Sequence, residues 1–467
     1  MLFSSISFLY YFLPIVLVVY FITPKKGKNF VLLIASLIFY FFGEPIYCIL
    51  MIGSSLLGFI HGLVIDKYRG TKGAKVALAS SIISSVVILG FFKYADFFIE
   101  NINDLLALEL GLLHIALPIG ISFYTFQILS YTIDVYRGEA KVQKSFIKFA
   151  TYVSLFPQLI AGPIVRYTTI EEQLTTRHTS WDDIYIGSKR FIIGLAKKVI
   201  IANTLAEVGV LFANSADKSV ALYWLLAISF MLQIYFDFSG YSDMAIGLGR
   251  IFGFDFLENF NYPYIAKSIT EFWRRWHISL STWFRDYIYI PLGGSRVNFL
   301  KWVRNILLVW LLTGFWHGSE WNFILWGVYF GVLLILEKLF IGKILERLPK
   351  IVHHFYLLFL VLIGFVIFNS NGLKDMVTNF SGLFGGLDIP AINKETIYYL
   401  RNYIVPIFVA IIGSTPLLTK AIVKIKSYKK GEKIIKILEP IFLVVLLLTV
   451  TGCLISGSFN PFLYFRF

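Results

Sequence analysis

The sequence predicts an all-α, polytopic integral membrane protein with about 11 transmembrane helices and further re-entrant or interfacial helices. Of the 467 residues, 57% are hydrophobic and only 15% are charged, whereas soluble domains carry roughly 25% charged residues. So few charges could not cover a water-exposed surface. Aromatic residues reach 18%, which suits side chains at a bilayer interface. A series of apolar stretches, each near the roughly 20 residues that a spanning helix needs, completes the pattern.

Twelve apolar stretches are candidates for these spans, and we expect about 11 true spans with one or two partial insertions. They lie near residues 6–23, 29–50, 76–94, 105–133, 146–165, 190–212, 219–238, 303–318, 321–340, 354–371, 400–420 and 434–456. The first has no basic leader and no small-residue cleavage pattern, so we expect a retained span rather than a signal peptide. Because there is no internal repeat and no soluble segment longer than a loop, we expect one membrane domain over residues 1–467.

Charged residues in the loops predict the orientation of the chain. Basic residues gather near 25–28, 67–75, 137–148 and 420–436, whereas the loop at 96–104 is acidic. Because basic loops stay on the cytoplasmic side, we expect a multi-pass protein of the cell membrane whose N-terminus lies outside. The net charge of +14 would then face anionic membrane lipid, and no nucleic-acid partner is expected.

Several chemistries are disfavoured by what the sequence lacks. Cys48 and Cys453 are its two cysteines, which excludes a disulfide framework and a cysteine-rich metal site. There is no phosphate-binding loop of the GxxxxGK type, no GxSxG turn and no HExxH helix, which argues against nucleotide-driven pumping and serine hydrolysis. Metal ligation by His277 and His317 would lack a clear third ligand, so no metal site is predicted.

Acidic residues interrupt the apolar pattern first in the segment QIYFDFSGYSDMAIG, residues 233–247. Asp237 lies four residues after Gln233 and shares its helix face, the sequence SGYS at 239–242 predicts a bend, and Asp243 follows it. Charged groups inside a membrane face a bundle interior or a wet cavity. Asp237 and Asp243 therefore either line a substrate cavity or bind neighbouring helices, and the sequence leaves both open.

A basic amphipathic helix is predicted in FWRRWHISLSTWFRDYIYIPLGGSR, residues 272–296, ended by Pro291 and the following glycines. Arg274 and Arg285 should lie together on its polar side, with Arg275 nearby. Guanidinium groups suit phosphate, so these arginines bind either a substrate anion or lipid headgroups. The apolar side should carry Trp273, Trp276, His277, Leu280, Trp283 and Phe284.

A second histidine stands in LTGFWHGSEWNFILWG, residues 312–327. His317 is flanked by Trp316 and Gly318, with Trp321 shortly after. An imidazole in apolar surroundings stays neutral and can take a proton from a hydroxyl, as the general base of acyl transfer must. Gly318 would let a substrate approach the backbone closely.

These segments resemble the membrane-bound O-acyltransferase family, of the alginate O-acetyltransferase type. Besides the three segments above, LPIGISFYTFQILSYTIDVYRGE at 117–139 and LFPQLIAGPIVRY at 155–167 are similar to that family in order and spacing. The resemblance covers about residues 115–330, and the terminal LYFRF at 463–467 is also similar.

The resemblance implies a helical membrane enzyme in which passages from the two sides meet at a histidine. It makes His317 the catalytic base and His277 the residue that positions the acyl group or polarises its carbonyl. It also implies acetyl-CoA as the cytoplasmic donor, with no bound cofactor, an extracytoplasmic partner resembling SGNH hydrolases, and a cell-envelope polysaccharide such as alginate as acceptor. The candidates for substrate binding are Asp237, Asp243, Arg274, Arg275, Arg285, Trp276, Trp316 and Trp321.

Three alternatives stay open at this point. The D-alanyl transfer proteins of teichoic acid modification share the RWH and WHG elements but take their acyl group from a carrier protein, and the run RDYIYIPLGGSR favours the acetyl type. A transporter or lipid-linked sugar flippase would use Asp237 and Asp243 as coupling groups. An acyl channel would leave all the chemistry to a partner protein.

Overall fold

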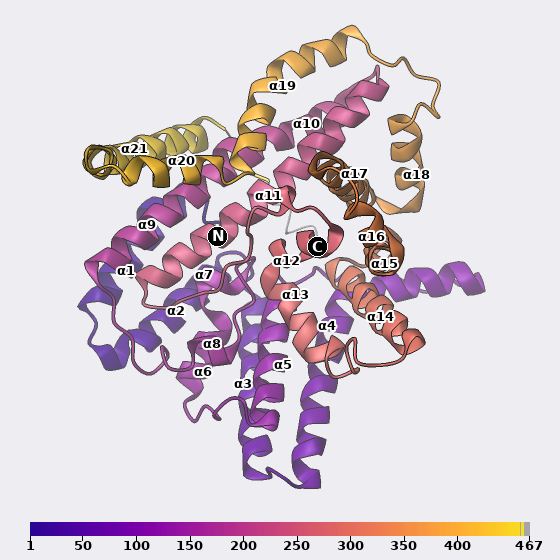
Figure 1. Ribbon diagram of the computed structural model, residues 1–467. Helices are drawn as coiled ribbons and strands as arrows, with labels where there is room; N and C mark the ends of the chain where they lie inside the picture. The colour runs from indigo at the N-terminus through magenta and orange to yellow at the C-terminus, as the bar shows by residue number, and fades with distance from the viewer. Residues whose placement is uncertain (458, 462–467) are drawn as a thin grey trace. The chain divides into compact units, whose positions relative to one another are not determined.

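The computed structural model describes residues 1–457 and 459–461, which form helices joined by loops and contain no strand (Figure 1). The chain divides into two compact units. The first consists of Met1–Phe191 and Ser242–Leu257, and the second of Ile192–Tyr241 and Glu258–Phe467. Each unit is described by itself, and the single-domain organisation expected from the sequence stays a prediction.

The first unit is built mainly from the N-terminal helices. Among them, α3, α4 and α5 pack against one another as a three-helix group (Figure 1). The helices are η1 (Phe8–Phe12), α1 (Leu13–Ile22), η2 (Lys25–Gly27), α2 (Lys28–Phe41), α3 (Tyr47–Lys67), α4 (Lys72–Leu106), α5 (Ile121–Arg137), α6 (Phe146–Ser154), α7 (Phe156–Leu159), α8 (Tyr167–Ile170), and parts of α9 (Trp181–Ala196) and α11 (Val220–Ile251).

Small residues allow the close packing of α3 on α5. A Cβ atom on Gly58 would lie 2.6 Å from the Ile128 side chain, and one on Gly62 would lie 2.5 Å from the Tyr131 ring. Membrane helices gain van der Waals contact where glycine lets their backbones approach. These two glycines therefore set the distance between α3 and α5.

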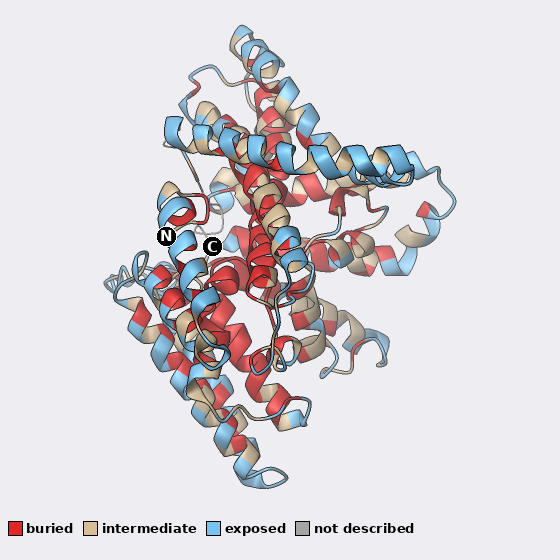
Figure 2. Ribbon diagram, turned by 90° about the vertical axis from the view of Figure 1, so that its left-hand side faces the viewer, coloured by how far each residue is buried: buried red, intermediate tan, exposed pale blue. Residues whose placement is uncertain are grey.

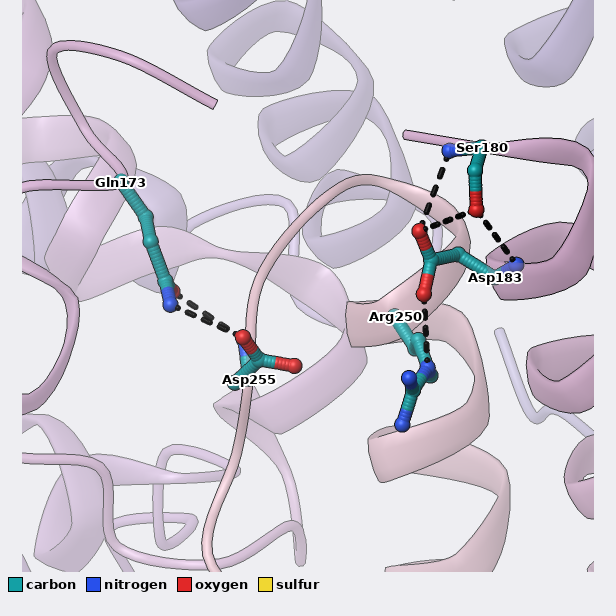
Figure 3. Close-up of polar contacts among 5 residues, drawn as sticks. All are labelled: Gln173, Ser180, Asp183, Arg250 and Asp255. Carbon is teal, nitrogen blue, oxygen red and sulfur yellow. Dashed lines mark hydrogen bonds and ion pairs between the residues drawn. The ribbon is translucent and has the colours of Figure 1, made fainter. Parts of the chain in front are cut away.

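A polar network ties two loops of the first unit together (Figure 3). The Asp183 carboxylate accepts hydrogen bonds from Ser180 N at 3.1 Å and Ser180 Oγ at 2.6 Å, and from Arg250 Nε at 3.0 Å. Gln173 Nε2 donates to Asp255 Oδ2 at 3.2 Å, and Gln173 Oε1 accepts from Asp255 N at 3.0 Å. These contacts fasten the loop before α9 to the end of α11 and the chain that follows it.

The second unit holds the rest of α9 and α11 and all later helices. Its apolar core is formed by buried side chains of α11, α12, α15 and α17. The remaining helices are η3 (Lys197–Ala202), α10 (Asn203–Asn214), η4 (Pro263–Ile265), α12 (Ile269–Arg275), α13 (Ile278–Phe284), η5 (Arg285–Tyr289), α14 (Phe299–His317), α15 (Trp321–Leu336), η6 (Glu337–Ile341), α16 (Gly342–Leu345), α17 (Lys350–Asn369), α18 (Gly372–Leu383), α19 (Lys394–Gly413), α20 (Leu417–Lys426) and α21 (Lys429–Ser456).

The helices α14 and α15 form a hairpin whose two arms cross at a pair of glycines. A Cβ atom on Gly314 would lie 2.3 Å from the carbonyl oxygen of Phe323, and one on Gly327 would lie 2.2 Å from that of Trp310. Such distances are far below van der Waals contact, and backbone atoms cannot move aside cheaply. The hairpin therefore requires glycine at both positions.

Eight helices among the described residues are long and apolar enough to cross a membrane, and a shorter apolar stretch runs over Phe8–Ile22. The multi-pass prediction is confirmed, whereas the expected number of about 11 spans is not. Figure 2 shows helices that are buried along most of their length and others that are largely exposed. The eight helical segments are Tyr47–Lys67, Lys72–Leu106, Val220–Ile251, Phe299–His317, Trp321–Leu345, Lys350–Asn369, Lys394–Gly413 and Lys429–Ser456.

Exposed apolar surface marks the helices that would contact lipid. Only 11% of the apolar window is buried in Lys72–Leu106 and in Lys429–Ser456, against 72% in Val220–Ile251. Large apolar side chains stay exposed along α21, Ile441 and Phe442 among them. A soluble protein would hide such a surface, but hydrocarbon accommodates it.

Three expected spans are interrupted by the backbone. The stretch 29–50 is divided because α2 ends at Phe41 and α3 begins at Tyr47. In 105–133 the chain is non-helical from Ala107, which is left-handed, to the start of α5. In 146–165, α6 ends before Leu155, and Pro157 then lies in the first turn of the short α7. Hydropathy alone could not place these breaks because the residues around them remain apolar.

We expect Gly314→Ala and Gly327→Ala to destabilise the protein by about 1–3 kcal/mol each, the usual cost of overpacking. The added methyl group would force α14 and α15 apart, as the distances above require. The measurement is thermal unfolding in detergent micelles followed by tryptophan fluorescence. Gly209→Ala in α10 is the matched control, since nothing lies within 4 Å of its added Cβ. Equal stability of the Gly314→Ala and Gly209→Ala proteins would contradict the prediction.

Candidate active site

The backbone turns at His277, between two short helices. α12 ends at Arg275, His277 has a φ of 44°, and α13 starts at Ile278. The single amphipathic helix expected from residue 272 onward is therefore wrong. Hydrogen bonds to a neighbouring loop explain the break, because Ile278 N donates to the carbonyl of Asn259 and Asn261 N to that of Arg275, both at 2.9 Å. These hydrogen bonds to the loop take the place of the backbone hydrogen bonds that a continuous helix would make here.

The His277 side chain is buried among aromatic rings, with 1% of its surface exposed. Its ring lies edge-on to Phe238, with 4.6 Å between centroids, and 6.0 Å from the Trp316 ring. Its Nδ1 atom is 3.2 Å from Asn259 Oδ1. Burial disfavours the charged imidazolium and lowers the pKa of His277 to about 3, so this ring is neutral near pH 7.

His317 ends α14 inside an aromatic enclosure and is 8% exposed. Its ring centroid lies 4.8 Å from that of Trp316, 5.0 Å from that of Trp326 and 5.3 Å from that of Phe368, each nearly edge-on. Trp316 thus contacts both His317 and His277. The structure brings the two histidines singled out from the sequence against the same indole ring, within the second unit.

The end of α17 contributes Phe368 to this aromatic enclosure. Asn322, fully buried near the start of α15, donates from Nδ2 to the carbonyl of Ser370 at 2.7 Å. The Phe323 ring packs on Phe368 at 5.0 Å, and it also covers Gly318, where a Cβ would lie 2.2 Å from it. We expected Gly318 to give a substrate close access to the backbone. Instead, this glycine makes room for the Phe323 ring.

A buried carboxylate anchors the helix that leads to His277. Glu337, 7% exposed, accepts hydrogen bonds from Ile269 N at 2.7 Å and Thr270 N at 2.9 Å. These amides open α12 and have no partner within the helix, so the carboxylate satisfies them and complements the helix dipole. Sequence reasoning missed Glu337, Asn259 and Asn322. An acid within the apolar run GVLLILEKLF was a signal that could have identified Glu337.

Both acids of the segment 233–247 form ion pairs. Asp237 Oδ1 lies 2.8 Å from Lys198 Nζ in the second unit, and Asp243 Oδ1 lies 2.9 Å from Arg190 Nη2 in the first unit. These pairs favour the interpretation that the acids bind neighbouring helical segments. Contact of either with substrate stays a prediction.

The bend expected around Gly240 is absent, because α11 continues through it. A Cβ on Gly240 would lie 2.7 Å from the carbonyl oxygen of Gly194 and 3.2 Å from Lys198 N. This glycine therefore permits a close helix approach rather than a turn. That approach brings Lys198 beside Asp237, and Lys198 Nζ also donates to Asn203 Oδ1 at 2.9 Å and to the carbonyl of Pro461.

The three arginines of the predicted anion site have separate surroundings. Arg275 pairs with Glu271 at 2.9 Å, Arg285 pairs with Asp286 at 2.6 Å, and Arg274 is exposed. The turn at His277 removes the helical register that placed Arg274 and Arg285 on one side. An anion-binding role for these arginines stays a prediction.

The remaining sequence candidates differ in burial. Trp276 and Trp316 are 5% exposed, whereas Trp321 is 48% exposed. Within residues 1–457 and 459–461, no group of three His, Cys, Asp or Glu side chains is arranged to hold a metal ion. The terminal LYFRF lies outside the described residues.

Comparison with known proteins decides the family. The model of the membrane-bound O-acyltransferase family matches residues 136–378, which is more than half of the chain. The chain belongs to this family. It is 40% identical to the "Probable alginate O-acetylase AlgI" of Azotobacter vinelandii over 86% of this chain and 82% of that protein. With its Pseudomonas putida counterpart of the same name it shares 38% identity over the full length of both chains.

Other relatives in this family have different printed acceptors. The "Peptidoglycan O-acetyltransferase" of Helicobacter pylori is 35% identical over 86% of this chain and 84% of its own length. The "Teichoic acid D-alanyltransferase" of Bacillus subtilis is 31% identical over 48% of this chain and 59% of its own length. The protein is thus a membrane O-acyltransferase whose relatives include enzymes named for three cell-envelope polymers.

We expect the Lys198–Asp237 ion pair to be structural. Both side chains are at most 4% exposed, so Asp237→Leu removes the carboxylate beside a buried ammonium and should cost about 3–5 kcal/mol. The double variant Lys198→Met/Asp237→Leu should regain most of this stability. Unfolding midpoints in micelles and acyl transfer by the purified variants provide the measurements. A stable but inactive double variant would instead support a substrate-binding role for Asp237.

Burial of a neutral His277 predicts a pH-dependent stability. In the unfolded chain this imidazole titrates near 6.5, whereas in the folded protein it does so near 3. Between these values the unfolded chain binds more protons, so stability falls as the pH is lowered through this range. The unfolding midpoint should therefore fall less between about pH 7 and pH 5 in His277→Gln than in the wild type. His178→Gln, at an exposed histidine, should keep the wild-type slope, and equal slopes in all three proteins would contradict the prediction.

Proposed function

We propose that this enzyme moves an acetyl group from cytoplasmic acetyl-CoA across the cell membrane for O-acetylation of a cell-envelope polysaccharide such as alginate. His317 is the general base, and His277 positions the acyl group or polarises its carbonyl. The observation that carries the proposal is the placement of both histidines against Trp316, in a family whose members transfer acyl groups to hydroxyls.

The surroundings of His317 suit proton transfer from a hydroxyl. Three aromatic rings enclose it, and they keep bulk water away from the imidazole. In the transfer step the acceptor oxygen attacks the acyl carbon while its proton passes to His317. The C–S bond then breaks, and the leaving thiolate takes a proton from the imidazolium, which restores the neutral base.

Transfer from a cytoplasmic donor to a cell-envelope polysaccharide requires an enzyme that is accessible from both sides of the membrane. Basic loops at 67–75 and 420–436 support a cytoplasmic entrance for the donor and an N-terminus outside. An extracytoplasmic SGNH-hydrolase-like partner would complete transfer to the polymer. The acetyl donor is favoured by the relatives named as alginate and peptidoglycan O-acetylating enzymes, which match over 86% or more of this chain.

D-alanyl transfer to teichoic acid from an acyl carrier protein is the second candidate. It is favoured by the relative from Bacillus subtilis, whose similarity covers 48% of this chain. The two functions differ in what mild alkaline hydrolysis releases from the envelope, acetate in one case and D-alanine in the other.

We expect His317→Ala to abolish envelope O-acetylation while the protein still accumulates in the membrane. A general base contributes typically about 10²–10⁴-fold to the rate, and acetylation should fall by at least the lower factor. The measurement is acetate released from envelope polymers of a deletion strain complemented with each variant. His178→Ala, at an exposed histidine, should restore wild-type acetate.

Two outcomes would contradict this proposal. Unchanged acetate in the His317→Ala strain would remove His317 as the base. Release of D-alanine in place of acetate from the wild-type strain would establish the second candidate.

A further inference from the structure

The short helix α20 connects two long apolar helices and contains no buried residue. It follows α19, which ends at Gly413, and precedes α21, which begins at Lys429. Its 10 residues rise only about 15 Å, which is too short to cross a bilayer. Because α19 and α21 are each long and apolar enough to span a membrane, the helix that joins them belongs at a membrane surface.

One side of α20 is attached to the rest of the second unit. Thr419 Oγ1 and Tyr262 Oη lie 2.9 Å apart and share a hydrogen bond. Lys426, two turns further along the helix, forms an ion pair with Glu439 of α21, with 3.1 Å between Nζ and Oε2. The two helices lie side by side (Figure 1). These contacts fix which sides of α20 point away from the protein.

The outward sides of α20 are an apolar side and a lysine side. Helical spacing places Lys420 and Lys424, one turn apart, on the same side. Among the described residues, no carboxylate lies within ion-pair distance of either lysine. The apolar side is exposed along the whole helix and consists of Leu417, Leu418, Ala421, Ile422 and Ile425.

Positive charge continues from α20 into the start of α21. Residues 420–436 include seven lysines and one glutamate. Lys436 pairs with that glutamate, Glu432, at 2.7 Å, and Lys426 pairs with Glu439 as described above. Most of the lysines in this segment therefore carry a charge that no carboxylate offsets.

This combination of charge and apolar surface fits an anionic phospholipid bilayer. An exposed apolar face is unfavourable in water, whereas it is accommodated at the boundary between headgroups and acyl chains. Lysine side chains can extend their ammonium groups from that depth to the headgroups. A zwitterionic lipid surface would cover the apolar side but would leave the lysine charges uncompensated, and an anionic surface attracts them.

We propose that α20 lies in the plane of the membrane surface and, with the start of α21, binds the headgroups of anionic phospholipids through its lysines. Its apolar side enters the hydrocarbon. This surface lies outside the candidate active site, and its test does not depend on acetyl transfer. Tyr262 belongs to the loop in which Asn261 N donates to the carbonyl of Arg275. The lipid-binding helix is thereby joined to the loop that contacts the end of α12.

The depth of α20 in the bilayer is the first measurement. Spin labels are placed at Ala421→Cys and Val423→Cys, which lie on roughly opposite sides of a helix because they are two residues apart. The background is Cys48→Ala/Cys453→Ala, which removes both native cysteines. In nanodiscs that contain phosphatidylglycerol, we expect oxygen to relax the label at Ala421→Cys. A water-soluble nickel chelate should relax the label at Val423→Cys.

Lipid preference is the second measurement. Energy transfer from a dye on Val423→Cys compares trace phosphatidylglycerol with trace phosphatidylcholine carrying the same acceptor. We expect phosphatidylglycerol to be enriched, and Lys420→Gln/Lys424→Gln should lower this preference by at least about fivefold. Sodium chloride at about 1 M should lower it as well, because salt screens exposed charges. Lys374→Gln/Lys394→Gln removes the same charge at exposed lysines outside α20 and α21 and should keep the wild-type preference.

Three results would overturn the proposal. The first is a label at Ala421→Cys that only the nickel chelate relaxes. The second is an equal lipid preference in the wild type and in Lys420→Gln/Lys424→Gln. The third is loss of phosphatidylglycerol to adenosine bisphosphate but not to sodium chloride of equal ionic strength, which would assign the lysines to a soluble nucleotide phosphate. If the double variant does not accumulate, a wild-type preference that persists in about 1 M salt also contradicts the proposal.

Discussion

The crossing of α14 and α15 at Gly314 and Gly327 is the constraint on which the candidate site depends. Backbone atoms of the two helices come close enough there that no side chain fits at either glycine. Helices in lipid gain little from apolar burial, so such contact is a principal source of their association. The crossing sets how far the end of α14 lies from the start of α15. His317 and Trp326 face each other because of it.

Buried polar groups then position the elements around this hairpin. Asn322 Nδ2 binds the carbonyl of Ser370 at the end of α17, the Glu337 carboxylate accepts from Ile269 N at the start of α12, and Asn259 Oδ1 accepts from Ser279 N beside the turn at His277. In each case a side chain forms a hydrogen bond with a backbone group that has no partner within its helix. Leaving such a group unpaired away from water would cost free energy. The aromatic rings form the apolar surroundings of His317, and these three polar side chains hold the helix ends and the turn near those rings in position. Fold and site chemistry are thus built from the same contacts.

The sequence predicted an all-helical membrane protein and singled out two histidines that the structure places against Trp316, and it did so for physical reasons. Low charge and long apolar stretches are properties of composition, and the histidines stand out against apolar neighbours. It could not predict that α12 ends before His277, because the partner that breaks the helix, Asn259, lies in another loop. The straight passage of α11 through Gly240 was missed for a similar reason, since close packing on Gly194 is a tertiary contact.

Polar residues within apolar segments carry most of the missing information, but the sequence does not say which partner each has. Asp237 was open to two interpretations until Lys198 was found beside it. Glu337 binds backbone amides rather than a charge, and an acidic residue alone does not reveal that difference. His277 is held in a similar way, because Asn259 Oδ1 lies 3.2 Å from its Nδ1 atom and the Asn259 carbonyl accepts from Ile278 N. In this enzyme the sequence is enough to single out a catalytic candidate. The contacts that govern what the candidate can do chemically are made by residues distant in the chain.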